Sequence, residues 1–293
     1  MTCADCLSEP GLLLALNGAD ERLQLALGRI APGGLDDGGG DESVAPLAAQ
    51  EWTVPGSAVR FLAPGIRQVL DSLGLAARDI RRIACVVGPG SFTGLRMSLA
   101  LAQGLAAGTD AELAGLNHLE LLACEAAQCS GEASGQGAAQ GAGQGGGQGG
   151  GSVAALVWSR RGQVYAQAFS GGGDQALPLG PAQVLALAAL PEFLAALPRP
   201  VRLLGGGLRR NLPFFEELAG RDPGLRLLPA LWDAPRPSAL LDLASRAAYG
   251  LQALEPVYLR ASDAEDNLAA IAAGRGLDAV EAQAVLDRGS RAV

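Results

Sequence analysis

The chain has 293 residues, 49% of them hydrophobic and 18% charged, and its formal net charge is −8. This composition indicates a globular protein long enough for two lobes, and the absence of a long uninterrupted apolar run argues against a membrane span. All 22 basic residues are arginines, and they do not cluster into a basic surface stripe. The chain is therefore not expected to bind a nucleic-acid backbone by itself.

The cysteines are an odd, scattered set: Cys3, Cys6, Cys85, Cys124 and Cys129. They favour reduced thiols in a cytoplasmic chain, and no secretion signal precedes them. The first two form a lone Cys-x-x-Cys pair, which supplies half of a structural zinc site, and no second pair follows. The sequence therefore predicts no metal site.

The first predicted element is a β-hairpin, because the apolar runs Leu12–Leu16 and Leu23–Leu27 flank the strong turn signal Asn17-Gly18. Residues 33–46 are acidic and rich in glycine, and their acid spacing matches no EF-hand, so a solvated loop is expected. Residues 61–73 then show the apolar spacing of a helix.

The most distinctive segment follows: an apolar strand at 83–87, a glycine turn, and a helix from residue 95 to 107 with cap-type residues before it. This arrangement presents backbone N–H groups to an anion, although a plain chain reversal is the alternative. A Walker A loop is excluded because the chain has no lysine, and the glycine spacing does not fit the dinucleotide fingerprint. The candidate anion-binding residues are Gly88, Gly90, Ser91, Thr93 and Gly94.

Residues 88–96, Gly-Pro-Gly-Ser-Phe-Thr-Gly-Leu-Arg, resemble the signature of the TsaB (YeaZ) family, which assists biosynthesis of threonylcarbamoyladenosine at position 37 of tRNA. Weaker similarity covers roughly residues 11–125 and 153–275, including a Pro-x-Tyr-Leu-Arg match at 256–260. The resemblance implies an α/β, actin-like or sugar-kinase-like (ASKHA) fold of two similar lobes, each a mixed sheet flanked by helices. The family's first turn usually reads Asp-Thr-Ser. Here Asn17, Gly18 and Ala19 stand in its place, which puts a phosphate or metal-water role at this turn in doubt.

The remaining segments complete the two lobes. Residues 126–152, nearly all Gly, Gln, Ala and Ser, are expected to be a disordered insertion. A hairpin at 153–169, a helix at 181–197, a strand at 201–204 that enters Gly205-Gly206-Gly207 and a helix at 239–254 follow. We expect residues 11–117, with the helix at 239–254, to form the first lobe, residues 118–238 the second, and residues 261–293 a tail.

No catalytic set is predicted. His118 is the only histidine, and a lone histidine at an element boundary is usually a surface or capping residue. It cannot form the His-x-x-x-His metal pair of TsaD, the catalytic relative, and Ser91 lacks a Gly-x-Ser-x-Gly context.

The resemblance implies an accessory subunit that forms a heterodimer with TsaD, joined by the ATPase TsaE, and that meets tRNA only indirectly. Its docking surface would come from the two predicted helices, through Leu62, Ile66, Val69, Arg96, Leu99, Ala100, Gln103, Gly104 and Ala107. A homodimer of the chain alone and ATP or ADP at the partner interface are left open. The alternative is an autonomous nucleotide-dependent enzyme of the sugar-kinase-like class, which requires a carboxylate base in the cleft between the lobes.

Overall fold

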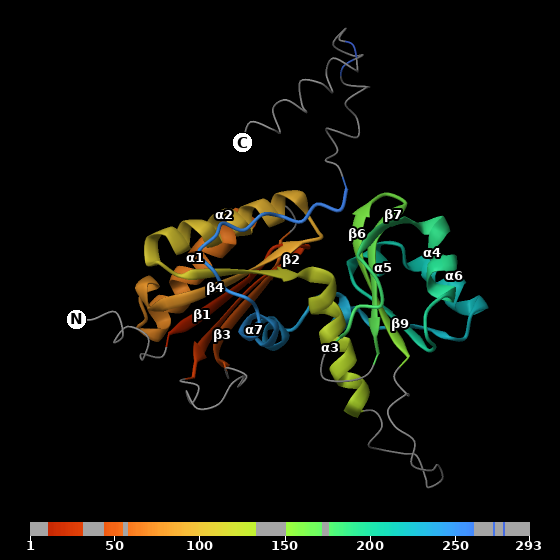
Figure 1. Cartoon of the computed structure of the whole chain (residues 1–293), viewed down its shortest axis with the longest axis horizontal. Coiled ribbons are helices and arrows are strands. Elements are labelled where there is room, and N and C mark those ends of the chain that lie inside the picture. The colour runs from red at the N-terminus through yellow and green to blue at the C-terminus, as the bar shows by residue number, and fades with distance from the viewer. Residues whose placement is uncertain are drawn as a thin grey trace. The chain divides into compact units, whose positions relative to one another are not determined.

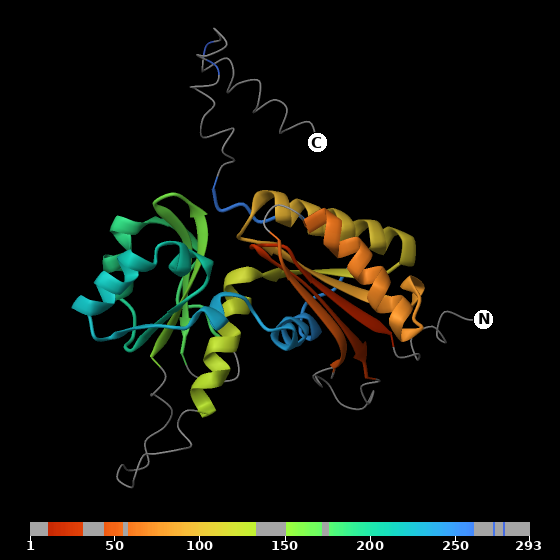
Figure 2. The ribbon, with the colours of Figure 1, turned by 180° about the vertical axis from the view of Figure 1, so that it is seen from behind.

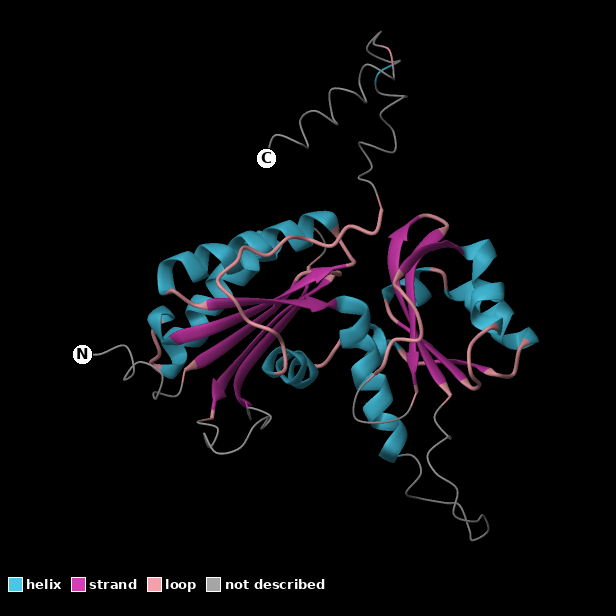
Figure 3. Ribbon diagram, in the orientation of Figure 1, coloured by secondary structure: helices cyan, strands magenta, loops and turns pink. Residues whose placement is uncertain are grey.

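The computed structural model describes residues 11–31, 44–54, 58–132, 151–171 and 176–260, together with residues 272 and 278. Residues 1–257 form one compact unit and residues 258–293 a second. The described part of the first unit contains two five-stranded sheets with helices packed against them (Figures 1 and 3). Within the described ranges, no helix is long and apolar enough to cross a membrane.

The first sheet has the strand order β3-β2-β1-β4-β5. Its strands are β1 (Leu12–Asn17), β2 (Arg22–Ile30), β3 (Val44–Thr53), β4 (Ile80–Gly88) and β5 (Glu112–Asn117). β1 pairs antiparallel with β2, which confirms the predicted hairpin, and β2 pairs antiparallel with β3. β1 pairs parallel with β4, and β4 pairs parallel with β5.

Alternate residues of the central strand β1 face opposite layers of helices, and the whole strand is buried. Leu12, Leu14 and Leu16 pack in the core beneath α1 (Ala58–Leu73) and α2 (Phe92–Thr109). Leu13 and Ala15 face the opposite core, which includes α7 (Pro237–Ser245). Each fully buried leucine stabilises the fold by about 1.5–3 kcal/mol, which accounts for the unbroken apolar run from Leu12 to Leu16.

The second sheet has the order β10-β9-β6-β7-β8. Its strands are β6 (Ser152–Arg160), β7 (Gln163–Ser170), β8 (Gln183–Ala186), β9 (Val201–Leu204) and β10 (Leu225–Leu227). Its core on one side includes residues of α4 (Leu190–Ala195), α5 (Gly206–Arg210) and α6 (Leu212–Arg221). The short 3-10 helices are η2 (Ala77–Asp79), η3 (Leu187–Ala189) and η4 (Ala230–Asp233).

The two sheets have the same topology. β6, β7, β8, β9 and β10 correspond in order and direction of pairing to β1, β2, β3, β4 and β5. α3 (His118–Glu132) contacts β4 and β5 of the first sheet and β6 and β7 of the second, and it lies between the sheets in both views (Figures 1 and 2). The predicted architecture, an α/β fold of two similar lobes that each contain a mixed sheet flanked by helices, is confirmed. The division of the chain at residue 118 stays a prediction.

Three predicted elements differ from the structure. The segment 181–197 is not one helix, because β8 pairs with β7 and Pro191 lies in the first turn of a new short helix, α4. The last helix ends at Ser245, because Gly250 turns back to pair with Leu113 through N···O contacts of 2.7 and 3.0 Å. Residues 126–132 belong to α3 rather than to an insertion, and residues 133–150 lie outside the described part.

Candidate functional site

The glycine turn joins β4 to α2, as the sequence predicts. Ser91 is the N-cap of α2, and its Oγ accepts a hydrogen bond from the Gly94 amide at 3.3 Å. Thr93, the other cap candidate, lies inside the first turn of the helix, and its side chain is exposed. The strand, turn and capped helix are therefore confirmed, with Ser91 as the capping residue.

The glycine turn packs directly on the backbone of the first turn. The Ser91 amide donates to the Ala19 carbonyl at 2.7 Å. A Cβ on Gly90 would lie 2.2 Å from the Ala19 oxygen, and a Cβ on Gly94 would lie 2.1 Å from the Gly18 oxygen. Both glycines are therefore needed for the close approach of two backbones.

The same packing bears on the expected anion site. The amides of Ser91 and Gly94 already donate to groups of the chain itself, so two donors of a phosphate cradle are in use. Gly88 has φ of 133°, and a Cβ there would lie 2.8 Å from the Val257 oxygen. These contacts favour a structural role for the turn, whereas anion binding by it stays a prediction.

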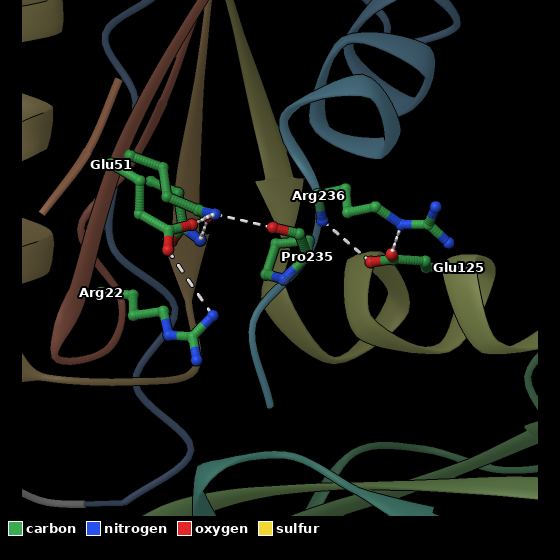
Figure 4. A network of polar contacts seen from close by, with 7 residues as sticks. Arg22, Glu51, Glu125, Pro235 and Arg236 are labelled. Atoms are coloured by element: carbon green, nitrogen blue, oxygen red, sulfur yellow. Dashed lines mark hydrogen bonds and ion pairs between the residues drawn. The ribbon is translucent and has the colours of Figure 1, made fainter. Parts of the chain in front are cut away.

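The first turn is held by a buried polar network (Figure 4). Asn17 accepts from the Ala19 amide at 3.1 Å and donates to Gln24 Oε1 at 2.9 Å. Gln24 Nε2 donates to the Pro235 carbonyl at 2.6 Å and to Glu51 at 2.7 Å. Asn17 therefore shapes the turn through its amide, in a place where a charged carboxylate would have no equivalent donor.

The network continues toward α3. Glu125, on α3, is 5% exposed and accepts from the backbone amide of Arg236 at 2.9 Å. The Arg236 guanidinium also pairs with the Glu125 carboxylate (Figure 4). The segment that enters α7 is thus fixed both to the first sheet and to α3.

The predicted docking residues divide into two groups. The first group is exposed or half-buried and lies on α2: Arg96, Ala100, Gln103, Gly104 and Ala107. The Gln103 amide nitrogen donates to the Leu254 carbonyl at 2.9 Å, and Arg96 lies over the Phe92 ring at 4.0 Å.

Leu62, Ile66, Val69 and Leu99 have exposed fractions of 1%, 5%, 6% and 3% and belong to the core of the first sheet. As surface contacts, these four predictions are wrong, because the apolar faces of α1 and α2 that carry them pack against the first sheet. They support the two helices from beneath, and the candidate surface is narrowed to α2.

His118 is not the surface or capping residue that the sequence suggested. It is fully buried, and its Nδ1 lies 3.2 Å from the Pro89 carbonyl in the glycine turn. The cap of α3 is Asn117, whose Oδ1 accepts from the Leu119 amide at 2.9 Å. Asparagine is the stronger capping type, and that local signal was available in the sequence.

Sequence reasoning also missed Asp20, which lies in the first turn. A Cβ on Gly206, at the start of α5, would lie 2.5 Å from Asp20 Oδ2, so this carboxylate of the first lobe contacts the second. Beside it, Glu21 pairs with Arg210 of α5. No motif connects these positions, because the contact joins residues about 190 positions apart in the chain.

Burial shifts the pKa values of both Asp20 and His118. It raises the pKa of Asp20, against the opposing effects of His118, Arg210 and Arg22. It lowers the pKa of His118, against the opposing effects of Asp20 and the Pro89 carbonyl. Among the described residues, no three His, Cys, Asp or Glu side chains gather as a metal site, whereas Cys3 and Cys6 lie outside them.

Comparison with known proteins gives consistent matches. Residues 57–134 match the family model of TsaD, tRNA N6-adenosine threonylcarbamoyltransferase. The chain is 28% identical to the tRNA threonylcarbamoyladenosine biosynthesis protein TsaB of Bacillus subtilis over 203 residues, covering 69% of this chain and 79% of that protein. It is 37% identical to the Escherichia coli TsaB over 62 residues, 21% of this chain and 27% of that one.

A solved structure agrees with these matches. YeaZ from Pseudomonas aeruginosa superposes with a TM-score of 0.59 at 25% identity, covering 85% of this chain and 100% of that chain. The similarity therefore extends over both lobes.

Proposed function

The chain belongs to the TsaB (YeaZ) family, and from this premise we propose that it is the non-catalytic accessory subunit that binds TsaD in threonylcarbamoyladenosine formation on tRNA. TsaE would join this pair as the ATPase. TsaD would carry the catalytic residues and, with the net charge of this chain at −8, most of the contact with tRNA.

The observation that carries the proposal is the exposed face of α2. Ala100, Gly104 and Ala107 follow one another at helical spacing, and all three are exposed. A Cβ on Gly104 would meet no atom of the chain within 4 Å. A helix of a partner could therefore approach this face closely, while the buried glycine turn holds the start of α2 in place.

The test uses Gly104→Leu, which fills the proposed contact with a bulky side chain. We expect TsaD to bind this variant roughly ten- to a hundredfold more weakly than the wild type, because overpacking costs about 1–3 kcal/mol. The measurement is calorimetric titration with purified TsaD, with and without ATP or ADP. Leucine favours a helix more than glycine, so the variant should remain folded.

Gly220→Leu is the matched control, because Gly220 is an exposed glycine near the end of α6 with open space around it. It should bind TsaD as the wild type does. If the wild type, Gly104→Leu and Gly220→Leu bind TsaD with equal affinity, α2 is not part of the interface. Failure of the wild type to co-elute with TsaD would overturn the proposed function itself.

A further inference from the structure

An open cavity lies beside the C-terminal half of α2. Its volume is about 290 Å³, just below the range of roughly 300–1,000 Å³ that is usual for small-molecule sites, so it suits a single side chain. Its walls come from α2, from β5 and from the segment that follows α7. The lining residues that matter here are Gln103, Ala107, Asp110, Leu113 and Leu251.

The wall formed by the segment after α7 is held at both ends. Gly250 pairs with Leu113 of β5 through N···O contacts of 2.7 and 3.0 Å, and the Leu254 carbonyl accepts from Gln103 Nε2 at 2.9 Å. The chain therefore passes across β5 and then along α2 (Figure 3). Between these fixed points Leu251 is 81% exposed. The fold thus holds a large apolar side chain at the cavity while most of its surface stays in contact with solvent.

The charge at this cavity is negative. Asp110 is the C-cap of α2, where the helix dipole is negative, and no basic residue lies in the last turn of the helix. Within the described ranges Asp110 has no ion pair, and the nearby carboxylate of Glu112 is paired with Arg82 at 3.5 Å. An acidic side chain at this end of a helix destabilises the free chain, whereas a cation would be attracted by both the carboxylate and the helix end.

We propose that this cavity is a specificity pocket for one basic side chain of TsaD, an arginine or a lysine. The aliphatic stem of that side chain would pack on Ala107 and Leu251, and its charged group would meet Asp110 at the end of α2. The pocket rests on the proposed function, because Ala107 belongs both to the cavity and to the exposed face of α2. It extends the proposed contact to the C-terminal end of the helix.

Asp110→Asn removes the charge and keeps the turn, because asparagine tolerates the left-handed conformation of Asp110, whose φ is 56°. By calorimetric titration we expect TsaD to bind this variant about five- to thirtyfold more weakly at about 50 mM salt. The difference should shrink at about 500 mM salt, where the charges are screened. The Tm of the free variant should rise by roughly 1–3 °C, since the unfavourable charge at the helix end is gone.

The matched control for the charge is Asp242→Asn, at an exposed aspartate on α7 that does not line the cavity. It should bind TsaD as the wild type does at both salt concentrations.

Leu251→Ala tests the apolar wall of the cavity. We expect roughly tenfold weaker binding at both salt concentrations, together with an unchanged Tm, because a leucine this exposed adds little to the free fold. Leu231→Ala, on η4, is the control, since Leu231 is 68% exposed and does not line the cavity.

The results separate the pocket from the proposed function. If the wild type binds TsaD and both cavity variants bind equally well, the pocket is overturned and the proposed function stands. A loss of affinity in Asp110→Asn that salt leaves unchanged would contradict a charged occupant. A lower Tm for Asp110→Asn would mean that a cation of the chain itself already pairs with this carboxylate, which also overturns the pocket. If the wild type fails to co-elute with TsaD, both proposals fall.

Discussion

Gly94→Ala is expected to lower the free energy of unfolding by about 2–4 kcal/mol, although alanine normally favours a helix. The added methyl would lie 2.1 Å from the Gly18 carbonyl oxygen, which is backbone and cannot rotate away. The glycine turn and the first turn would have to separate, and the bond from the Ser91 amide to the Ala19 oxygen would weaken. Chemical denaturation measures the effect as a lower midpoint.

Gly104→Ala is the control within the same helix. Its methyl meets no atom within 4 Å, so the helix preference of alanine should raise stability by up to about 1 kcal/mol. Both substitutions replace glycine by alanine, but Gly94→Ala should lower the free energy of unfolding, whereas Gly104→Ala should raise it. If Gly94→Ala is as stable as Gly104→Ala, the close packing of the two turns does not hold the start of α2.

The glycine turn shows what the sequence could and could not predict. Its strand, its tight reversal and the Ser91 cap follow from local signals, and the structure confirms them. The use of its amides depends on Ala19, about 70 residues earlier in the chain, and no local pattern encodes that contact. A turn able to hold an anion and a turn packed on another backbone have the same glycine spacing.

The short elements were harder to predict for a related reason. β5 reads Glu-Leu-Ala-Gly-Leu-Asn, which contains no β-branched residue, and its strand conformation comes from pairing with β4. β8 looks helical by composition, yet it pairs with β7. His118 was misjudged because its burial depends on α3 packing against both sheets.

Gln24→Leu is expected to lower the free energy of unfolding by about 2–5 kcal/mol, because it leaves several buried polar groups without partners. Leucine has a similar volume, so lost packing would contribute little. The substitution removes the bonds of Gln24 to Asn17, to the Pro235 carbonyl and to Glu51. Asn17 is 1% exposed and Pro235 is also buried, so water cannot easily replace the lost partner.

The Gln24→Leu substitution should also affect the start of α7, because Gln24 bonds to the segment that leads into that helix. Pro235 directly precedes Arg236, which Glu125 holds on α3, and α7 begins one residue later. Loss of the Gln24 bond should therefore increase hydrogen exchange at the start of α7 as well as lower the denaturation midpoint. Gln68→Leu, on the exposed face of α1, is the control and should change the midpoint little. Equal midpoints for the two variants would mean that the buried network does not stabilise the junction between the first sheet, α3 and α7.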